Sequence, residues 1–161
     1  MADGVIYNHF PGIAKNFQTA IKKVVGATAT KIKVRASIRA PRDTGFLGDS
    51  IYTVINGKST YGTRLRTTAK GGRRKVKIGR DDLLPEIPPP PDAFTAYAVV
   101  GAYYGQYVNY GTRFMAAQPF WEPAIDATQP DFLAALAAIE SMIGQGVMTA
   151  DASMIVTDSG F

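Results

Sequence analysis

Nucleophilic and acid–base catalysis have few residues to use in this sequence. The chain contains no cysteine and a single histidine, His9. Without cysteine there is no disulfide, thiolate metal site or cysteine nucleophile, and we expect a reducing compartment. A Ser-His-Asp triad would depend on His9 alone, which precedes the first predicted helix. We interpret His9 as an exposed polar residue.

Two short motifs look like ligand sites, but the residues around them do not match the pattern of a calcium-binding or phosphate-binding loop. Asp81 and Asp82 are adjacent acids, yet the flanking residues supply no further ligands at the spacing of a calcium loop. Residues 57–60 (GKST) resemble the end of a phosphate-binding loop, but Tyr52 stands where that loop needs a glycine. We interpret both motifs as turns. The sequence therefore predicts no catalytic residue, no metal and no cofactor, and we expect a protein that is not an enzyme.

Positive charge is concentrated in one stretch. Between Lys58 and Arg80 there are nine bases and no acid, and because the whole chain carries +5, the rest carries −4. Such a segment can neutralise phosphates without a defined fold or can contact an acidic surface of another subunit, which we favour because few aromatics are interleaved for base stacking. The candidate polyanion or acidic-partner contacts are Arg64, Arg66, Lys70, Arg73, Arg74, Lys75 and Lys77.

Apolar spacing predicts the elements that must position any site. Steps of three and four from Ile13 to Ala36 predict an amphipathic helix that starts near Pro11 or Gly12 and ends before Pro41. Residues 50–56 and 94–102 read as strands, and residues 75–78 as a short third one. Both sides of 94–102 are apolar, which suggests that one face meets a neighbouring subunit. Thr128, Pro130 and Asp131 look like the start of a last helix that ends at Gly144.

These elements predict one α+β domain over residues 1–161, with a long N-terminal helix and a C-terminal helix packed on a small antiparallel sheet. Residues 57–93 form a long insertion that ends in the extended Pro88–Pro91 run, and residues 147–161 a flexible tail. We find no signal-peptide pattern and no apolar stretch long enough to span a membrane, so we expect a soluble protein.

Three segments resemble a known family. Residues 40–51 (APRDTGFLGDSI), 104–112 (YGQYVNYGT) and 118–124 (QPFWEPA) occur in this order after the long helix. The pattern is similar to that of the head-tail joining, or tail-completion, proteins of long-tailed bacteriophages, which are neck or minor tail components. Gly48 replaces a usual basic residue, and Asn109 stands where an acid is common.

The resemblance implies a structural virion protein that forms a ring of identical subunits, a hexamer, joining the head connector to the tail. The partners would be a second copy of itself, other neck, connector and tail-tube proteins, and non-specific contact with genomic DNA in the lumen, with no membrane. The location would be the virion, and the host cytoplasm during assembly. The candidate interface or structural residues are Pro41, Thr44, Gly45, Leu47, Ser50, Tyr107, Gly111, Thr112, Pro119, Phe120, Trp121 and Pro123.

Two alternatives stay open. The first is a tail terminator protein that caps the tail tube before head attachment. The second, from another class, is a DNA-binding accessory protein that uses the basic segment. Locating the protein in purified particles would distinguish a neck protein or tail terminator from a DNA-binding accessory protein.

Overall fold

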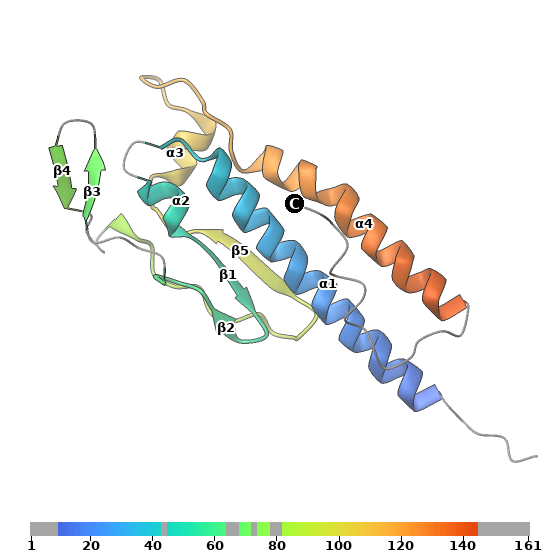
Figure 1. The fold of residues 1–161 in the computed structure, drawn as a ribbon. Helices are drawn as coiled ribbons and strands as arrows, with labels where there is room; N and C mark the ends of the chain where they lie inside the picture. The colour runs from blue at the N-terminus through green and yellow to red at the C-terminus, as the bar shows by residue number, and fades with distance from the viewer. Residues whose placement is uncertain (1–9, 43–44, 64–67, 72–73, 78–81, 145–161) are drawn as a thin grey trace, which may run out of the picture.

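The computed structural model describes residues 10–42, 45–63, 68–71, 74–77 and 82–144. Its elements follow the order α1 (Phe10–Arg39), α2 (Phe46–Ser50), β1 (Ile51–Ile55), β2 (Lys58–Ser59), β3 (Thr68–Gly71), β4 (Arg74–Lys77), β5 (Ala96–Val100), α3 (Gly105–Tyr110) and α4 (Glu122–Gly144). Figure 1 shows α1 lying over a small sheet, along the direction of β1 and β5, and α4 running beside α1. The predicted α+β class is therefore confirmed.

The main sheet has three antiparallel strands in the order β2-β1-β5. Ile51 is opposite Val100 and Ile55 is opposite Ala96, so β1 and β5 pair along their whole length. The predicted strands at 50–56 and 94–102 are confirmed with slightly shorter bounds. In the described part of the chain β5 is an edge strand, and β3 and β4 form a separate two-stranded antiparallel pair.

Long-range polar contacts join α1 to α4. The Arg35 guanidinium donates to the Ala127 carbonyl, to Thr128 Oγ1 at 2.9 Å and to Asp131 Oδ2 at 2.8 Å. Lys31 Nζ lies 3.5 Å from the same carboxylate oxygen. The hydrogen bond from Arg35 is the main cause that lowers the pKa of Asp131. These contacts fix the register between two helices that lie far apart in the sequence.

The predicted start of the last helix is wrong. The helix begins at Glu122, and Pro130 lies inside it. Pro123 suits the opening turn, where a missing backbone N–H costs nothing. Pro130 removes one helical hydrogen bond, but packing against α1 holds this stretch helical, with Thr128 and Ala124 fully buried. Tertiary contacts therefore outweigh the local proline signal.

Two short helices were not predicted. Gly45 precedes α2, with φ of 81° and its carbonyl accepting from the Asp49 N–H at 3.0 Å. Gly111 and Thr112 follow helix α3. Both helices are too short to show a clear helical period. Packing of their buried residues against other segments stabilises them. Thr44 and the predicted tail at 147–161 lie outside the described residues.

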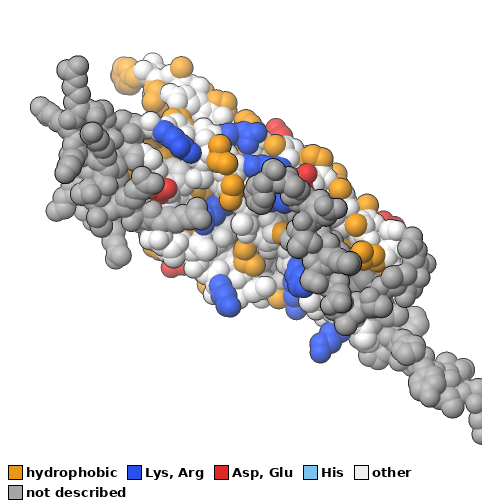
Figure 2. All heavy atoms as spheres, in the orientation of Figure 1, with side chains coloured by type: hydrophobic (Ala, Val, Ile, Leu, Met, Phe, Trp, Pro, Cys, Tyr) orange, Lys and Arg blue, Asp and Glu red, His pale blue; other side chains and the backbone are white. Residues whose placement is uncertain are grey.

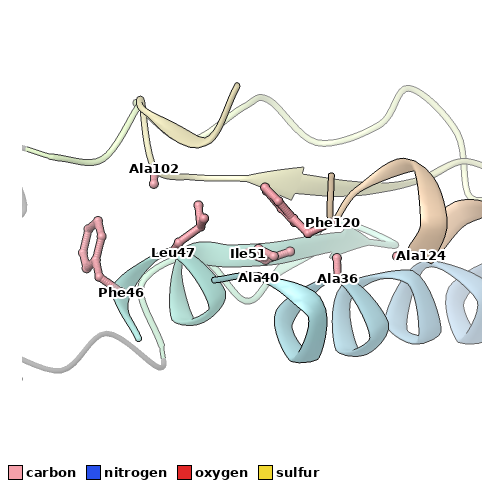
Figure 3. Packing of buried hydrophobic residues seen from close by; sticks show 8 residues of the cluster. All are labelled: Ala36, Ala40, Phe46, Leu47, Ile51, Ala102, Phe120 and Ala124. Atoms are coloured by element: carbon pink, nitrogen blue, oxygen red, sulfur yellow. The ribbon is translucent and has the colours of Figure 1, made fainter. Parts of the chain in front are cut away.

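The core sits where α1, α2, β1 and the start of α4 meet. Its buried members are Ala36, Ala40, Phe46, Leu47, Ile51, Ala102, Phe120 and Ala124. Figure 3 shows Phe120 and Ile51 in the layer between the sheet and α1, with the small side chains of Ala36 and Ala124 beside them. The alanines let the helices approach closely. A second cluster, built on Ala20, Val24 and Ile139, fills the α1–α4 seam.

Candidate assembly surface

The first motif serves the fold. Leu47 is in the core, and Pro41 is half-buried just after α1. The hydroxyl of Ser50 donates to the Leu47 carbonyl at 2.7 Å and accepts from the Ala102 N–H at 3.1 Å. Ser50 thus ties the start of β1 to the segment after β5. Leu47 and Ser50 therefore stabilise the fold.

The second and third motifs are joined by Asn109, which is 4% exposed. Its side-chain oxygen accepts from the Phe120 N–H at 3.0 Å and the Trp121 N–H at 3.1 Å. Its side-chain nitrogen donates to both carboxylate oxygens of Glu122, at 3.0 and 2.7 Å. A single amide therefore satisfies two backbone donors and holds the acid at the first turn of α4. The sequence did not single out Asn109 or Glu122 as a pair.

Glu122 also interacts with Tyr110. The hydrogen bond from the Tyr110 hydroxyl, followed by that from Asn109, lowers the pKa of Glu122, and the same contact raises the pKa of Tyr110. A lowered carboxyl pKa contributes stability that is present above its unfolded value and is lost as pH falls through the folded value. This contribution is therefore complete at neutral pH and disappears on acidification.

We predict that Asn109→Asp destabilises the subunit, because a carboxylate at this position would face Glu122 at hydrogen-bonding distance with no proton to donate. Glu122→Gln should restore most of the loss, since an amide could then donate to the new aspartate. Chemical unfolding of both single variants and the double variant at pH 7 measures the coupling. Equal destabilisation by Asn109→Asp with and without Glu122→Gln would contradict this account.

The loop after α3 presents apolar side chains to solvent. Gly111 has φ of 77°, and a Cβ there would lie 2.7 Å from the Ala117 nitrogen, so this position requires glycine. Thr112 and Met115 then exchange two backbone hydrogen bonds, of 2.8 and 3.2 Å, that close a tight turn. Phe114 at this turn is 83% exposed, with the Arg113 guanidinium 4.3 Å from its ring centroid.

Exposed aromatic residues precede this loop and lie on it. We define the aromatic surface as Tyr103, Tyr107, Tyr110, Phe114 and Met115, all of which are exposed. Figure 2 shows hydrophobic side chains on the loop that follows α3. A hollow of about 480 Å³ adjoins it, lined by Tyr107, Trp121 and residues of β5 among others. Tyrosine, phenylalanine, methionine and arginine are enriched at protein interfaces, and exposed apolar groups that cluster mark such sites.

The predicted interface residues of these motifs separate into two sets. Tyr107 and Thr112 are exposed and belong to the aromatic surface or its turn, and Pro119 is exposed as well. Phe120 is 1% exposed and lies in the core, while Trp121 and Pro123 are half-buried. Sequence reasoning missed Tyr103 and Tyr110, because α3 spans only Gly105–Tyr110 and is too short to show a helical period.

The basic segment is only partly described. Lys70 lies on β3, and Arg74, Lys75 and Lys77 lie on β4, with Lys70 opposite Lys75 in the strand register. Besides the strand predicted at 75–78, the segment therefore contains β2 and β3. Arg64, Arg66 and Arg73 lie outside the described residues.

The described residues show neither a metal-binding cluster nor a membrane-spanning helix. Within the described ranges, no three histidine or acidic side chains come close enough to hold a metal ion. No helix among the described residues is long and apolar enough to cross a membrane. No protein-family model matches the chain, and no curated protein or solved structure is significantly similar to it.

Proposed function

We propose that this chain is a structural subunit of the neck of a long-tailed bacteriophage, where it assembles into a ring that joins the head connector to the tail. The observation that carries the proposal is the convergence of the three family-like segments. Leu47 of the first, Phe120 of the third, and Tyr104 and Val108 of the second pack in one core cluster. Segments that resemble one family in sequence thus also form one unit in space.

The aromatic surface supports the proposal in a second way. It includes residues of the second motif, which Asn109 ties to the third motif by accepting a hydrogen bond from the Phe120 N–H. Its composition is that of an interface core. A ring subunit needs surfaces of this kind on both sides, and assembly by itself requires no catalysis. Any contact with DNA in the ring lumen would be independent of its sequence. Lysines and arginines can neutralise phosphates without fixed side-chain geometry, whereas recognition of bases requires that geometry.

We predict that the protein is part of the mature particle. Deleting its gene from the phage should leave filled heads and separate tails, or tails of abnormal length, because the joint between them is missing. Quantitative mass spectrometry of purified particles and electron microscopy of the deletion lysate measure both effects. Normal infectious particles made without the protein would rule the proposal out. A protein absent from particles but bound to one DNA sequence far more tightly than to random DNA would instead identify an accessory DNA-binding protein.

A further inference from the structure

Four consecutive prolines, Pro88–Pro91, form an extended run before β5, which we call the proline ridge. Residues 84–90 lie in neither a helix nor a strand, and Pro88, Pro89 and Pro91 are exposed. Each proline fixes its own φ at about −65° and disfavours helical geometry in the residue before it. Consecutive prolines therefore adopt the polyproline II conformation, which has no internal hydrogen bonds. The ridge offers a partner exposed rings and backbone carbonyls that can accept hydrogen bonds.

Hydrogen bonds hold the chain in place at both ends of the ridge. Before it, the Ile87 N–H donates to the hydroxyl of the buried Tyr52 at 3.2 Å. After it, Asp92 Oδ1 accepts from the Phe94 N–H at 2.7 Å and from the Thr95 hydroxyl at 3.0 Å. Little further conformational entropy would therefore be lost when a partner binds the ridge.

The hollow beside the aromatic surface has the chemistry that binds such a ridge. Its volume of about 480 Å³ is within the range of ligand pockets, and its lining includes Tyr103, Tyr107, Tyr110 and Trp121. Domains that recognise polyproline segments use grooves lined by aromatic side chains. Gln106 also lines the hollow, and its amide and the indole N–H of Trp121 are donors suited to backbone carbonyls.

Acids flank the ridge, and a base lies on the loop of the aromatic surface. Glu86 and Asp92 are exposed on either side of the prolines, with no base between them. Arg113 is exposed on the loop after α3. Glu122 of α4 is already engaged by two hydrogen bonds from Asn109. Complementary charges orient a contact and fix its register, so they favour the ridge as the occupant of the hollow.

The ridge and the hollow are placed so that they meet between copies. The ridge precedes Ala96, where β5 begins, and α3 follows Val100, where β5 ends. The strand between them spans about 17 Å. Figure 1 shows α3 beyond one end of the sheet and the chain that leads into β5 at the other end. Because both ends of the ridge are held in place, it does not fold back into the hollow of its own copy.

We propose that the proline ridge of one copy binds in the aromatic-lined hollow of a second copy, with Arg113 of the second copy beside an acid that flanks the ridge. Donor and acceptor are different parts of the molecule, so the contact is heterologous and its repetition can close a ring. This inference rests on the proposed function and names the segment that the aromatic surface contacts in the ring.

Trp121 provides a direct test, because it lines the hollow and is the only tryptophan in the chain. A peptide with the sequence of residues 85–93 (PEIPPPPDA) should change the Trp121 fluorescence of the dilute full chain and saturate below about 1 mM. A matched peptide with alanine at positions 88–91 should bind at least roughly tenfold more weakly, and so should the wild-type peptide to Tyr107→Ala. Ile38→Ala, on α1, should bind the peptide as the wild type does.

A mixing experiment on the full chain tests the polarity of the contact. One variant lacks the ridge through Pro88→Ala, Pro89→Ala and Pro91→Ala, and the other has an altered hollow through Tyr107→Ala and Arg113→Glu. Each variant alone should stay monomeric where the wild type assembles. Their equimolar mixture should form a dimer and no larger species, because each pair retains one intact ridge and one intact hollow. Sedimentation velocity measures each case.

Pro85→Ala is the matched control for the variant without the ridge, since Pro85 is an exposed proline of the same segment. It should assemble as the wild type does. Thermal unfolding of each variant verifies its fold, and the peptide titration of the wild-type chain decides the question where a variant does not fold.

The inference is overturned by a peptide that does not bind below about 1 mM, by equal binding of the alanine peptide, or by a wild-type chain that stays monomeric at about 1 mM. Equal peptide binding by Tyr107→Ala, or a mixture that stays monomeric or grows beyond a dimer, also overturns it. An aromatic-surface variant that loses infectivity while the wild-type chain binds no peptide assigns the hollow to a different protein of the particle.

The particle analysis above is independent of these results. A chain found in virions but failing the peptide titration would therefore keep the proposed function and lose this contact.

Discussion

Phe120→Ala is expected to lower the free energy of unfolding by about 3–5 kcal/mol, the range for a buried phenylalanine. The ring is 1% exposed and packs in the core cluster with Leu47, Ile51 and Ala124. Truncation would leave a cavity at the junction of three elements. Hydrogen bonds between the side chains of Ser50 and Asn109 and neighbouring backbone groups restrain the walls from collapsing into it. Chemical denaturation of the purified chain measures the loss.

Phe114→Ala is the matched control, since it makes the same change at a ring that is 83% exposed. Its effect on unfolding should stay within about 0.5 kcal/mol. Similar losses for the two variants would show that the Phe120 side chain does not occupy the core.

Loss of assembly with an intact fold is the second large effect that we expect. Phe114→Ala combined with Tyr107→Ala removes two exposed rings of the aromatic surface. Aromatic interface anchors contribute about 2 kcal/mol or more each, so two of them weaken one contact by roughly a thousandfold. In the proposed ring the loss would recur at every contact, so infectivity should fall below detection when this variant is supplied to a phage lacking the gene.

Ile38→Ala serves as its control because Ile38 is an exposed apolar residue of α1 outside the aromatic surface. That variant should complement fully. Thermal unfolding of all variants separates assembly from folding. Full infectivity of the double aromatic variant would remove the aromatic surface from the assembly interface.

The sequence predicted α1 and β1 from local signals of two kinds. The apolar stripe of α1 has a helical period, whereas β1, buried over most of its length, was predicted from its β-branched and aromatic residues. The helices α2 and α3 span about one turn and are held by packing from other segments. Local spacing cannot reveal them. The start of α4 was misplaced for a related reason, because contacts with α1 override the effect of Pro130.

The candidate site was predicted in part. The motifs pointed to three segments that meet in one core cluster, and Tyr107 of the second is exposed. They did not separate core from surface, since a large apolar residue such as Phe120 suits either place equally. Asn109 was noticed only as an unusual residue. Its importance comes from Glu122 and two backbone donors, which only the folded chain brings to it.

The contact between α1 and α4 also sets when a new chain can fold. Arg35 meets Asp131, and Val24 and Ala20 meet Ile139, across about a hundred residues of sequence. At a synthesis rate of about 5–20 residues per second, α1 waits roughly 5–20 s on the ribosome for its partner helix. The part of its apolar stripe that packs on α4, including Ala20 and Val24, stays uncovered during that time. The N-terminal half alone is therefore the form most open to chaperones and proteases, and folding is completed only after α4 has been translated.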